Sequence, residues 1–134
     1  MKINDLMISS KARQYQFENA SWIRLIEFLD QENSYMKNRL SEILDQINDR
    51  DNLNLAESFQ TQFIIKDDLY EHLLHELKGQ ARKIKEATAN GKDLITQEMK
   101  KGQKNFRNQI EHIERDHIHF KKDYNTYLSS FSFT

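Results

Sequence analysis

No proline interrupts this 134-residue chain, and its only glycines are Gly79, Gly91 and Gly102. Proline and glycine are the residues that most strongly end or weaken helices. A β-sandwich or barrel needs frequent turn residues and β-branched strands, and this chain has few of either. The absence of cysteine also excludes disulfide frameworks and cysteine-based zinc sites. The sequence therefore predicts an all-α fold.

Three heptad patterns predict three long helices. In each pattern core positions recur at steps of three and four, which places them on one helix face and favours coiled-coil packing. The third pattern contains one irregular step, a second successive step of four from Phe106 to Ile110, which predicts a local unwinding of the coiled coil. We interpret Asn33, Lys66 and Gln80 as polar core residues that set the alignment of the helices. The core positions are, in the first pattern, Trp22, Ile26, Leu29, Asn33, Met36, Leu40, Ile43 and Ile47, flanked by Leu25, Phe28 and Leu44; in the second, Ala56, Phe59, Phe63, Lys66, Tyr70, Leu73, Leu77, Gln80, Ile84 and Ala87; in the third, Ile95, Met99, Gly102, Phe106, Ile110, Ile113, His117, Phe120, Tyr124, Tyr127 and Phe131.

Turn-forming residues separate the three patterns. The segment 48–54 is rich in Asn and Asp, which favour turns and helix caps, and it predicts the first turn. Asn90 and Gly91 predict the second turn, because Gly and Asn readily adopt the left-handed conformation that ends a helix. Asp93 is then expected to cap the third helix.

The three predicted helices have nearly equal lengths and short connections. This combination is what an up-down-up arrangement requires. We therefore expect a long antiparallel three-helix bundle with coiled-coil packing. The predicted organisation is an N-terminal arm over residues 1–9, a bundle over residues 10–130 with helices at about 10–49, 53–89 and 93–130, and an aromatic tail over residues 131–134.

Charge is balanced overall but uneven along the chain. There are 20 Lys and Arg against 21 Asp and Glu, yet nine cations face three anions between Lys78 and Arg107. In an up-down-up bundle this segment lies at one end, and the opposite end collects carboxylates (Glu42, Asp45, Asp49, Asp51 and Glu57). The predicted partner-binding basic end consists of Lys83, Lys85, Lys92, Lys100, Lys101 and Lys104.

Several partners would fit a basic end. An acidic protein surface, a phosphate-rich ligand or the acidic end of a second copy would each complement its charge. Nucleic acid fits least well, because Phe106 is the only aromatic residue there and it occupies a core position. We expect a protein partner or self-association, including a homodimer, and no nucleic-acid binding.

One histidine is expected on the outer surface of the second helix. His75 takes the outermost heptad position and opens the pentad His75-Glu76-Leu77-Lys78-Gly79. This pentad resembles the His-x-Leu-Lys-Gly signature of histidine-phosphotransfer domains, which are helical bundles of similar size. The resemblance implies that His75 accepts the phosphoryl group, that Lys78 balances its charge, and that Gly79 leaves room for a receiver domain. It covers five to seven residues of the chain, and Arg82 and Lys83 then replace the small residues of the family.

Another histidine raises the question of a metal site. Only Glu114-x-x-His117 has the spacing of the Glu-x-x-His pairs that build di-iron sites in helical bundles, and no second copy exists. The expected register places His117 opposite Phe63, with Met36 and Leu40 nearby, in an apolar layer without further ligands. We therefore predict no metal and no cofactor, and we interpret His117 as a core histidine with one polar partner.

The aromatic residues near the C-terminus allow two interpretations. They would either cap the open end of the bundle or form an exposed patch that recruits a partner. These residues are Tyr124, Tyr127, Phe131 and Phe133.

No catalytic constellation emerges from the sequence. It contains no Gly-rich phosphate loop, no pair of carboxylates at core positions and no nucleophile with a nearby base. We also find no signal peptide and no membrane-spanning stretch, and we expect a cytoplasmic protein. The predicted function is a non-enzymatic helical interaction or scaffold module. The alternatives are a histidine-phosphotransfer-like signalling protein using His75 and a metal-binding helical bundle.

Overall fold

The computed structural model describes residues 3–89 and 94–131, with side chains from residue 11 onward. It contains the three long helices α1 (Ile3–Ile43), α2 (Arg50–Ala87) and α3 (Gln97–Ser129), and a short 3-10 helix, η1 (Leu44–Gln46). No strand occurs in these residues, so the all-α prediction is confirmed. None of the described helices carries an apolar stretch long enough to cross a membrane.

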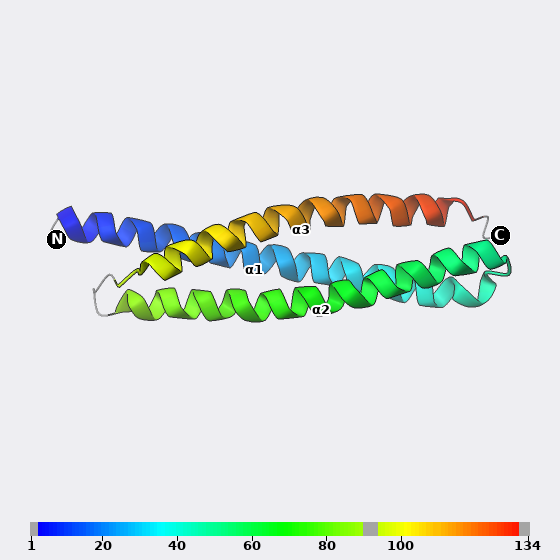
Figure 1. The fold of residues 1–134 in the computed structure, drawn as a ribbon, viewed down its shortest axis with the longest axis horizontal. Helices are drawn as coiled ribbons and strands as arrows, with labels where there is room; N and C mark the ends of the chain where they lie inside the picture. The colour runs from blue at the N-terminus through cyan, green and yellow to red at the C-terminus, as the bar shows by residue number, and fades with distance from the viewer. Residues whose placement is uncertain (1–2, 90–93, 132–134) are drawn as a thin grey trace.

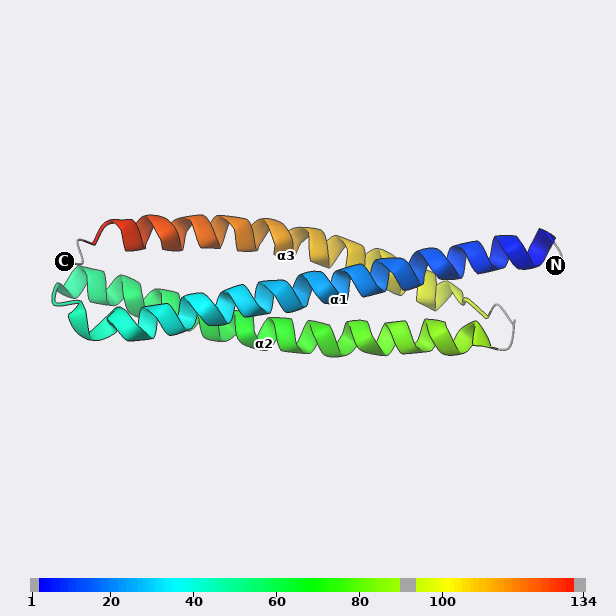
Figure 2. The same ribbon diagram turned by 180° about the vertical axis from the view of Figure 1, so that it is seen from behind.

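The three long helices lie side by side and form a rod (Figure 1). Seen from behind, the start of α1 extends beyond the end of α2 and the start of α3 (Figure 2). The start of α1 and the connection from α1 to α2 lie at opposite ends of the rod. The end of α2 and the start of α3 lie at the same end of the rod as the start of α1.

The first helix is longer at its start than predicted. It begins at Ile3, so residues 3–9 of the predicted N-terminal arm are helical and continuous with α1. Its regular part ends at Ile43, and η1 extends it to Gln46. The second helix begins at Arg50, where the Asp49 carboxylate accepts a 3.1 Å hydrogen bond from the backbone N–H of Asn52. The first turn is therefore shorter than the predicted segment 48–54.

The second connection is longer than predicted. Helix α2 ends at Ala87, and α3 begins only at Gln97. The N-cap of α3 is Thr96, whose hydroxyl accepts a 3.1 Å hydrogen bond from the Met99 backbone N–H. The prediction of Asp93 as N-cap is therefore wrong. Asp93 itself lies outside the described residues, as do Asn90 and Gly91.

Most of the core forms two apolar clusters that follow one another along the rod. Each combines residues from all three long helices, as expected when three amphipathic stripes face one another. The turn cluster, near the connection from α1 to α2, contains Met36, Leu40, Ile43, Ile47, Ala56, Phe63, Phe120, Tyr124 and Tyr127. The mid-helix cluster contains Ile26, Leu29, Tyr70, Leu73, Leu77, Ile110 and Ile113.

Aromatic side chains fill the space between α3 and the other helices in the turn cluster. Helices α1 and α2 pack closely along their lengths, and α3 lies farther from both. The Phe63 ring meets the Phe120 and Tyr124 rings edge-on, with centroid distances of 5.1 and 5.2 Å. Phe59 contacts the same two rings and Tyr127. These edge-on contacts suit the electrostatics of aromatic rings and stabilise the wider spacing.

The described aromatic residues near the C-terminus cap the end of the rod. Tyr127 is buried, and its hydroxyl donates a 2.7 Å hydrogen bond to the backbone carbonyl of Asn52. Tyr124 is buried as well and donates to the carbonyl of Met36. Phe131 packs on Tyr127 at a centroid distance of 4.9 Å. The capping interpretation is thus supported for these residues, whereas Phe133 lies outside the described residues.

Most predicted core residues are buried. The half-buried ones are Trp22, Phe59, Gln80, Ile95, Met99, Gly102, Phe106 and Phe131. In α3 the seven-residue spacing continues from Ile110 back to Gln103, which is buried, whereas the predicted core residue Gly102 is half-buried. The irregular step predicted in this helix is therefore wrong. In α1, Phe28 was expected beside the core, but its side chain is 54% exposed.

Candidate functional site

A polar layer separates the two apolar clusters near the middle of the rod. Its buried members, Asn33, Lys66 and His117, come from α1, α2 and α3 respectively, and each occupies a core position. A buried polar group costs free energy unless it is hydrogen-bonded. The partners of these three side chains therefore decide what the layer does.

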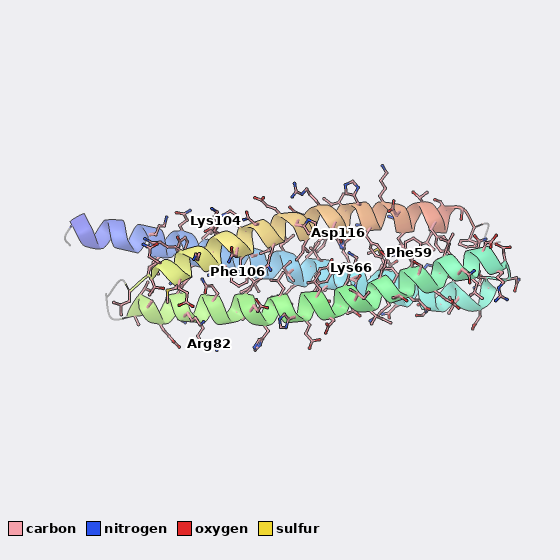
Figure 3. All side chains as sticks on the ribbon, in the orientation of Figure 1. Phe59, Lys66, Arg82, Lys104, Phe106 and Asp116 are labelled. Atoms are coloured by element: carbon pink, nitrogen blue, oxygen red, sulfur yellow. The ribbon has the colours of Figure 1, made fainter. Side chains whose placement is uncertain are left out.

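Lys66 joins α2 to α3. Its ammonium group forms an ion pair with Asp116 of α3 and lies 4.7 Å from the centroid of the Phe120 ring. Figure 3 shows Lys66 and Asp116 facing each other between the two helices. The ammonium thus has a carboxylate and an aromatic face as partners, which offsets the cost of its burial.

His117 joins all three helices. Its Nε2 lies 3.0 Å from the Glu32 carboxylate, and its Nδ1 lies 3.2 Å from the Tyr70 hydroxyl. Because a carboxylate can only accept, the Nε2–H donates to Glu32; in the neutral ring, Nδ1 then accepts from the Tyr70 O–H. The second oxygen of Glu32 pairs with Lys121. Burial raises the pKa of Tyr70, so this phenol stays protonated as the donor.

Asn33 joins α1 to α2. Its side-chain NH₂ donates to the Phe63 carbonyl at 3.0 Å and to the Asp67 carboxylate at 2.7 Å. Asp67 also forms an ion pair with Lys37. The interpretation of Asn33 and Lys66 as residues that set helix alignment agrees with these contacts, because each side chain bonds to particular residues of one neighbouring helix.

The expected surroundings of His117 need correction. It lies opposite Tyr70, one heptad away from the predicted neighbour Phe63, and its layer is polar. The reason is the longer second connection: the midpoint between Ala87 and Gln97 lies beyond residue 90, which shifts the residues of α2 and α3 that face each other. The predicted polar partner of His117 is confirmed, and it has two.

The Glu32–His117–Tyr70 chain resembles an acid–base relay but offers no access to a substrate. His117 and Tyr70 are 2% and 1% exposed. A catalytic base must reach the proton it removes within hydrogen-bond distance, directly or through one water molecule. The geometry therefore supports a structural role for this chain.

Glu32 makes the stability of the rod depend on pH. Burial raises the pKa of Glu32, but hydrogen bonds from Lys121 and His117 lower it more, so the net pKa lies below its ordinary 4.5. A lowered folded-state pKa stabilises the fold fully above pH 4.5, and this stabilisation disappears as the pH falls through the folded-state value. Glu32→Gln is expected to lower the free energy of unfolding by about 1–3 kcal/mol at pH 7. The difference from the unmodified chain should shrink below pH 4.5, measured by urea unfolding across the pH range; a constant difference would contradict the assignment.

His75 lies on the exposed surface of α2, as predicted, and lines a groove between α1 and α2. Within the described residues no side chain hydrogen-bonds its ring. Lys78 lines the same groove, and a side chain at Gly79 would meet open space. The groove also contains four carboxylates, those of Asp30, Asp67, Asp68 and Glu71.

Those carboxylates give the surroundings of His75 a negative electrostatic potential. Burial raises the pKa of Asp30, and the nearby Asp67 raises it further. A phosphoryl group on His75 would add negative charge to the same groove, with Lys78 as the lining cation. Electrostatic repulsion therefore weighs against phosphorylation at this position.

The described residues contain no group of three or more side chains that could hold a metal ion. Glu114 is exposed, whereas His117 turns into the polar layer. The two members of the predicted Glu-x-x-His pair therefore point in different directions.

The lysines of the predicted basic end gather where α2 ends and α3 begins. Lys83 and Lys101 face a groove of about 520 Å³ between these helices, which is also lined by Met99 and Phe106. Lys100, Lys101 and Lys104 line a neighbouring hollow on α3. Figure 3 locates Lys104, Phe106 and Arg82 at this end of the rod. Lys85 is exposed on α2, and Lys92 lies outside the described residues.

Ion pairing distinguishes the basic end from the middle of the rod. Lys37, Lys66 and Lys121 each pair with a carboxylate. No such pair with a described residue forms at the basic end, where the lysine side chains are exposed (Lys83, Lys85, Lys100, Lys101 and Lys104). The described lysines of the basic end therefore carry positive charge without ion pairs to described residues, beside a groove in which Met99 and Phe106 lie among polar residues.

Gly102 explains how this groove is built. A Cβ at this position would lie 3.0 Å from the Gln80 Nε2, so glycine makes room for the Gln80 side chain to cross from α2. Gln80 then donates a 3.1 Å hydrogen bond to the backbone carbonyl of Met99. The neighbour of Gly102 is thus a side chain, and Gln80 connects α2 to α3 at this level.

Sequence reasoning missed the charged partners of the polar layer. Glu32 and Asp116 lie beside the core stripe, where charged residues are common and carry no distinctive signal. A lysine at a core position, Lys66, does indicate that a carboxylate must lie on a neighbouring helix. Choosing Asp116 among several carboxylates requires the register of α3.

Comparison with known proteins gives no relative for this chain. No protein-family description, no curated protein and no solved structure matches it.

Proposed function

We propose that this chain is a non-enzymatic helical interaction module whose basic end binds an acidic protein surface. Its scaffold would be a long antiparallel three-helix bundle with coiled-coil packing and up-down-up order. A cytoplasmic location stays a prediction from the sequence.

Contacts between the helices support this scaffold. Between α1 and α2, Gln16 bonds Thr88 and Asn33 bonds Asp67. Residue numbers therefore rise along α1 as they fall along α2. Between α1 and α3, Glu18 bonds Arg107 and Glu32 bonds Lys121, so numbers rise together. Burial at heptad spacing is what coiled-coil packing requires.

The observation that carries the functional proposal is the unpaired charge at the basic end. Lysines that serve only to keep a protein soluble need not lie together on its surface. Here Lys83 and Lys101, which form no ion pair with a described residue, line a groove together with Met99 and Phe106. Glu98 is the one carboxylate among the lining residues. A partner with carboxylates around an apolar side chain would complement both features.

The test compares two labelled acidic peptides of equal length and charge, one containing Glu and Phe and the other Glu and Ala. Fluorescence anisotropy at low and high salt would measure their binding to the full chain. We expect the Phe peptide to bind more tightly and both affinities to fall with salt. The double variant Lys83→Glu, Lys101→Glu should lose about tenfold in affinity, or ~1.4 kcal/mol.

The matched control is Arg115→Glu, Lys122→Glu, which makes the same charge change on exposed residues of α3 away from the groove. Its affinity for the Phe peptide should stay close to that of the unmodified chain. Equal losses in the two double variants would indicate nonspecific attraction and contradict the proposal. No binding at low salt would also contradict it, as would tighter binding of single-stranded DNA of the same charge.

The alternative of phosphotransfer rests on one observation, the exposed His75 ring with Lys78 and open space at Gly79 beside it. Incubation with a phosphorylated receiver domain would test it. Acid-labile phosphate that appears on the chain, disappears in His75→Gln and persists in His72→Gln would support this alternative over the binding module. Absence of phosphate would remove it.

A further inference from the structure

The outer face of α1 carries a second heptad pattern that no part of the described structure covers. Phe17, Phe28 and Tyr35 are 71%, 54% and 73% exposed. They share one helix face, and steps of four and three connect them through Ser21, Arg24 and Gln31. Exposed apolar residues are ordinary when scattered, but a line of aromatic rings at coiled-coil spacing is typical of a helix-packing surface. We call these six residues the outer stripe.

The spacing of residues along the outer stripe is the same in both chain directions. If two copies of α1 lie antiparallel with their centres at residue 26, Phe17 of one copy comes opposite Tyr35 of the other. Arg24 then comes opposite Phe28, and Ser21 opposite Gln31. If a first residue of one copy contacts a second residue of the other copy, the second residue of the first copy also contacts the first residue of the other. A two-fold symmetric interface requires this reciprocity. Phe17 and Tyr35 are separated by about 27 Å along the helix, so the paired segment spans five turns.

Charge favours the antiparallel pairing over the parallel one. In a parallel pair at equal register, Arg24 would face Arg24 of the other copy, which is repulsive. In the antiparallel pair, Arg24 lies over the Phe28 ring and within one residue of the exposed Glu27 of the other copy. Both contacts are attractive for a guanidinium group.

The surface next to the outer stripe offers space for the partner's aromatic ring. A groove of about 340 Å³ runs between α1 and α3, and its lining includes Phe28, Tyr35, Lys121 and Asn125. In the antiparallel pair, the exposed Phe17 of the second copy arrives opposite Tyr35, beside this groove. Six aromatic rings that each cover roughly 150–250 Å² when fully buried would supply on the order of half of a standard interface of ~1,600 Å².

We propose that the outer stripe is the interface of an antiparallel, two-fold symmetric homodimer of this chain. The self-fit of the spacing and the charge complementarity of Arg24 with Glu27 identify a second copy as the occupant. This proposal uses a different surface from the basic end, so it does not depend on binding there. The basic ends of the two copies would point in opposite directions.

Sedimentation velocity over a concentration series tests the oligomeric state of the full chain. We expect a shift from monomer to dimer with rising concentration, abolished in Phe17→Ser, Phe28→Ser. The matched control is Ile64→Ser, Ile65→Ser, which removes two exposed apolar side chains from α2 and should leave the dimer intact. Circular dichroism of the stripe variant should match the unmodified chain, because neither ring belongs to the two apolar clusters.

Single cysteines test the orientation, because the chain has no cysteine of its own. Ser21→Cys and Gln31→Cys should form a disulfide when mixed under oxidation, while each alone should form none at dimer-forming concentration. Disulfides within each variant alone would indicate a parallel pair and overturn the proposed geometry. A monomer at all concentrations, or a dimer that persists in Phe17→Ser, Phe28→Ser, would overturn the interface itself.

Discussion

Phe63→Ala is expected to lower the free energy of unfolding by about 3–5 kcal/mol, the largest effect of any single substitution considered for this chain. Phe63 is fully buried and contacts the Phe120 and Tyr124 rings. Because α3 lies away from the other two helices at this level, no backbone can move in easily to fill the cavity. Urea unfolding followed by circular dichroism would measure the change.

The control for Phe63→Ala is Ile65→Ala, two residues further along the same helix and 61% exposed. It should change stability by less than about 0.5 kcal/mol, as substitutions of exposed residues usually do. Similar losses in the two variants would mean that α3 does not pack on Phe63. The packing of the turn cluster described above would then be wrong.

Asn19→Leu is expected to stabilise the rod by about 1–3 kcal/mol. Asn19 is fully buried at a core level of α1, yet neither its side-chain oxygen nor its nitrogen has a hydrogen-bond partner among the described residues. Leucine removes two unsatisfied polar atoms and adds apolar surface at a position where the heptad pattern favours it. The increase should be measurable as a higher midpoint of urea unfolding.

Asn33→Leu is the matched substitution, with the opposite expected sign. Asn33 is equally buried, but its NH₂ group donates to Phe63 and Asp67. Leucine would remove these bonds and leave Asp67 with Lys37 alone, so stability should fall. If both variants were stabilised equally, the hydrogen bonds of Asn33 would contribute nothing to the stability of the fold.

The positions that face the core could be predicted from the sequence because heptad spacing depends only on helix geometry. Ile26, Leu40, Leu77 and Ile84 are all fully buried as expected. The pairing of helices could not be predicted in the same way. A heptad pattern looks the same after a shift of seven residues. Phe63, the predicted neighbour of His117, and Tyr70, its neighbour in the structure, differ by such a shift.

The charged residues of the candidate site could be predicted from the sequence, but the groove beside them could not. The lysines of the basic end could be located because they cluster in sequence around one connection. The groove beside Lys83 and Lys101 could not, because it depends on Gln80 crossing at Gly102. The outer stripe escaped notice because Phe28 was assigned to the widened core, which left Phe17 and Tyr35 without a pattern to join.

The distribution of charge along the rod gives the molecule a large permanent dipole moment. Unpaired lysines lie at the end where α2 meets α3, and the carboxylates of Asp45, Asp51 and Glu57 lie towards the other end. A charged surface would therefore exert a torque on the rod and turn it before contact. The turning would be confined to the last ~8 Å of approach at physiological salt, where the field is not yet screened. A balanced net charge of −1 thus coexists with a strongly preferred direction of approach.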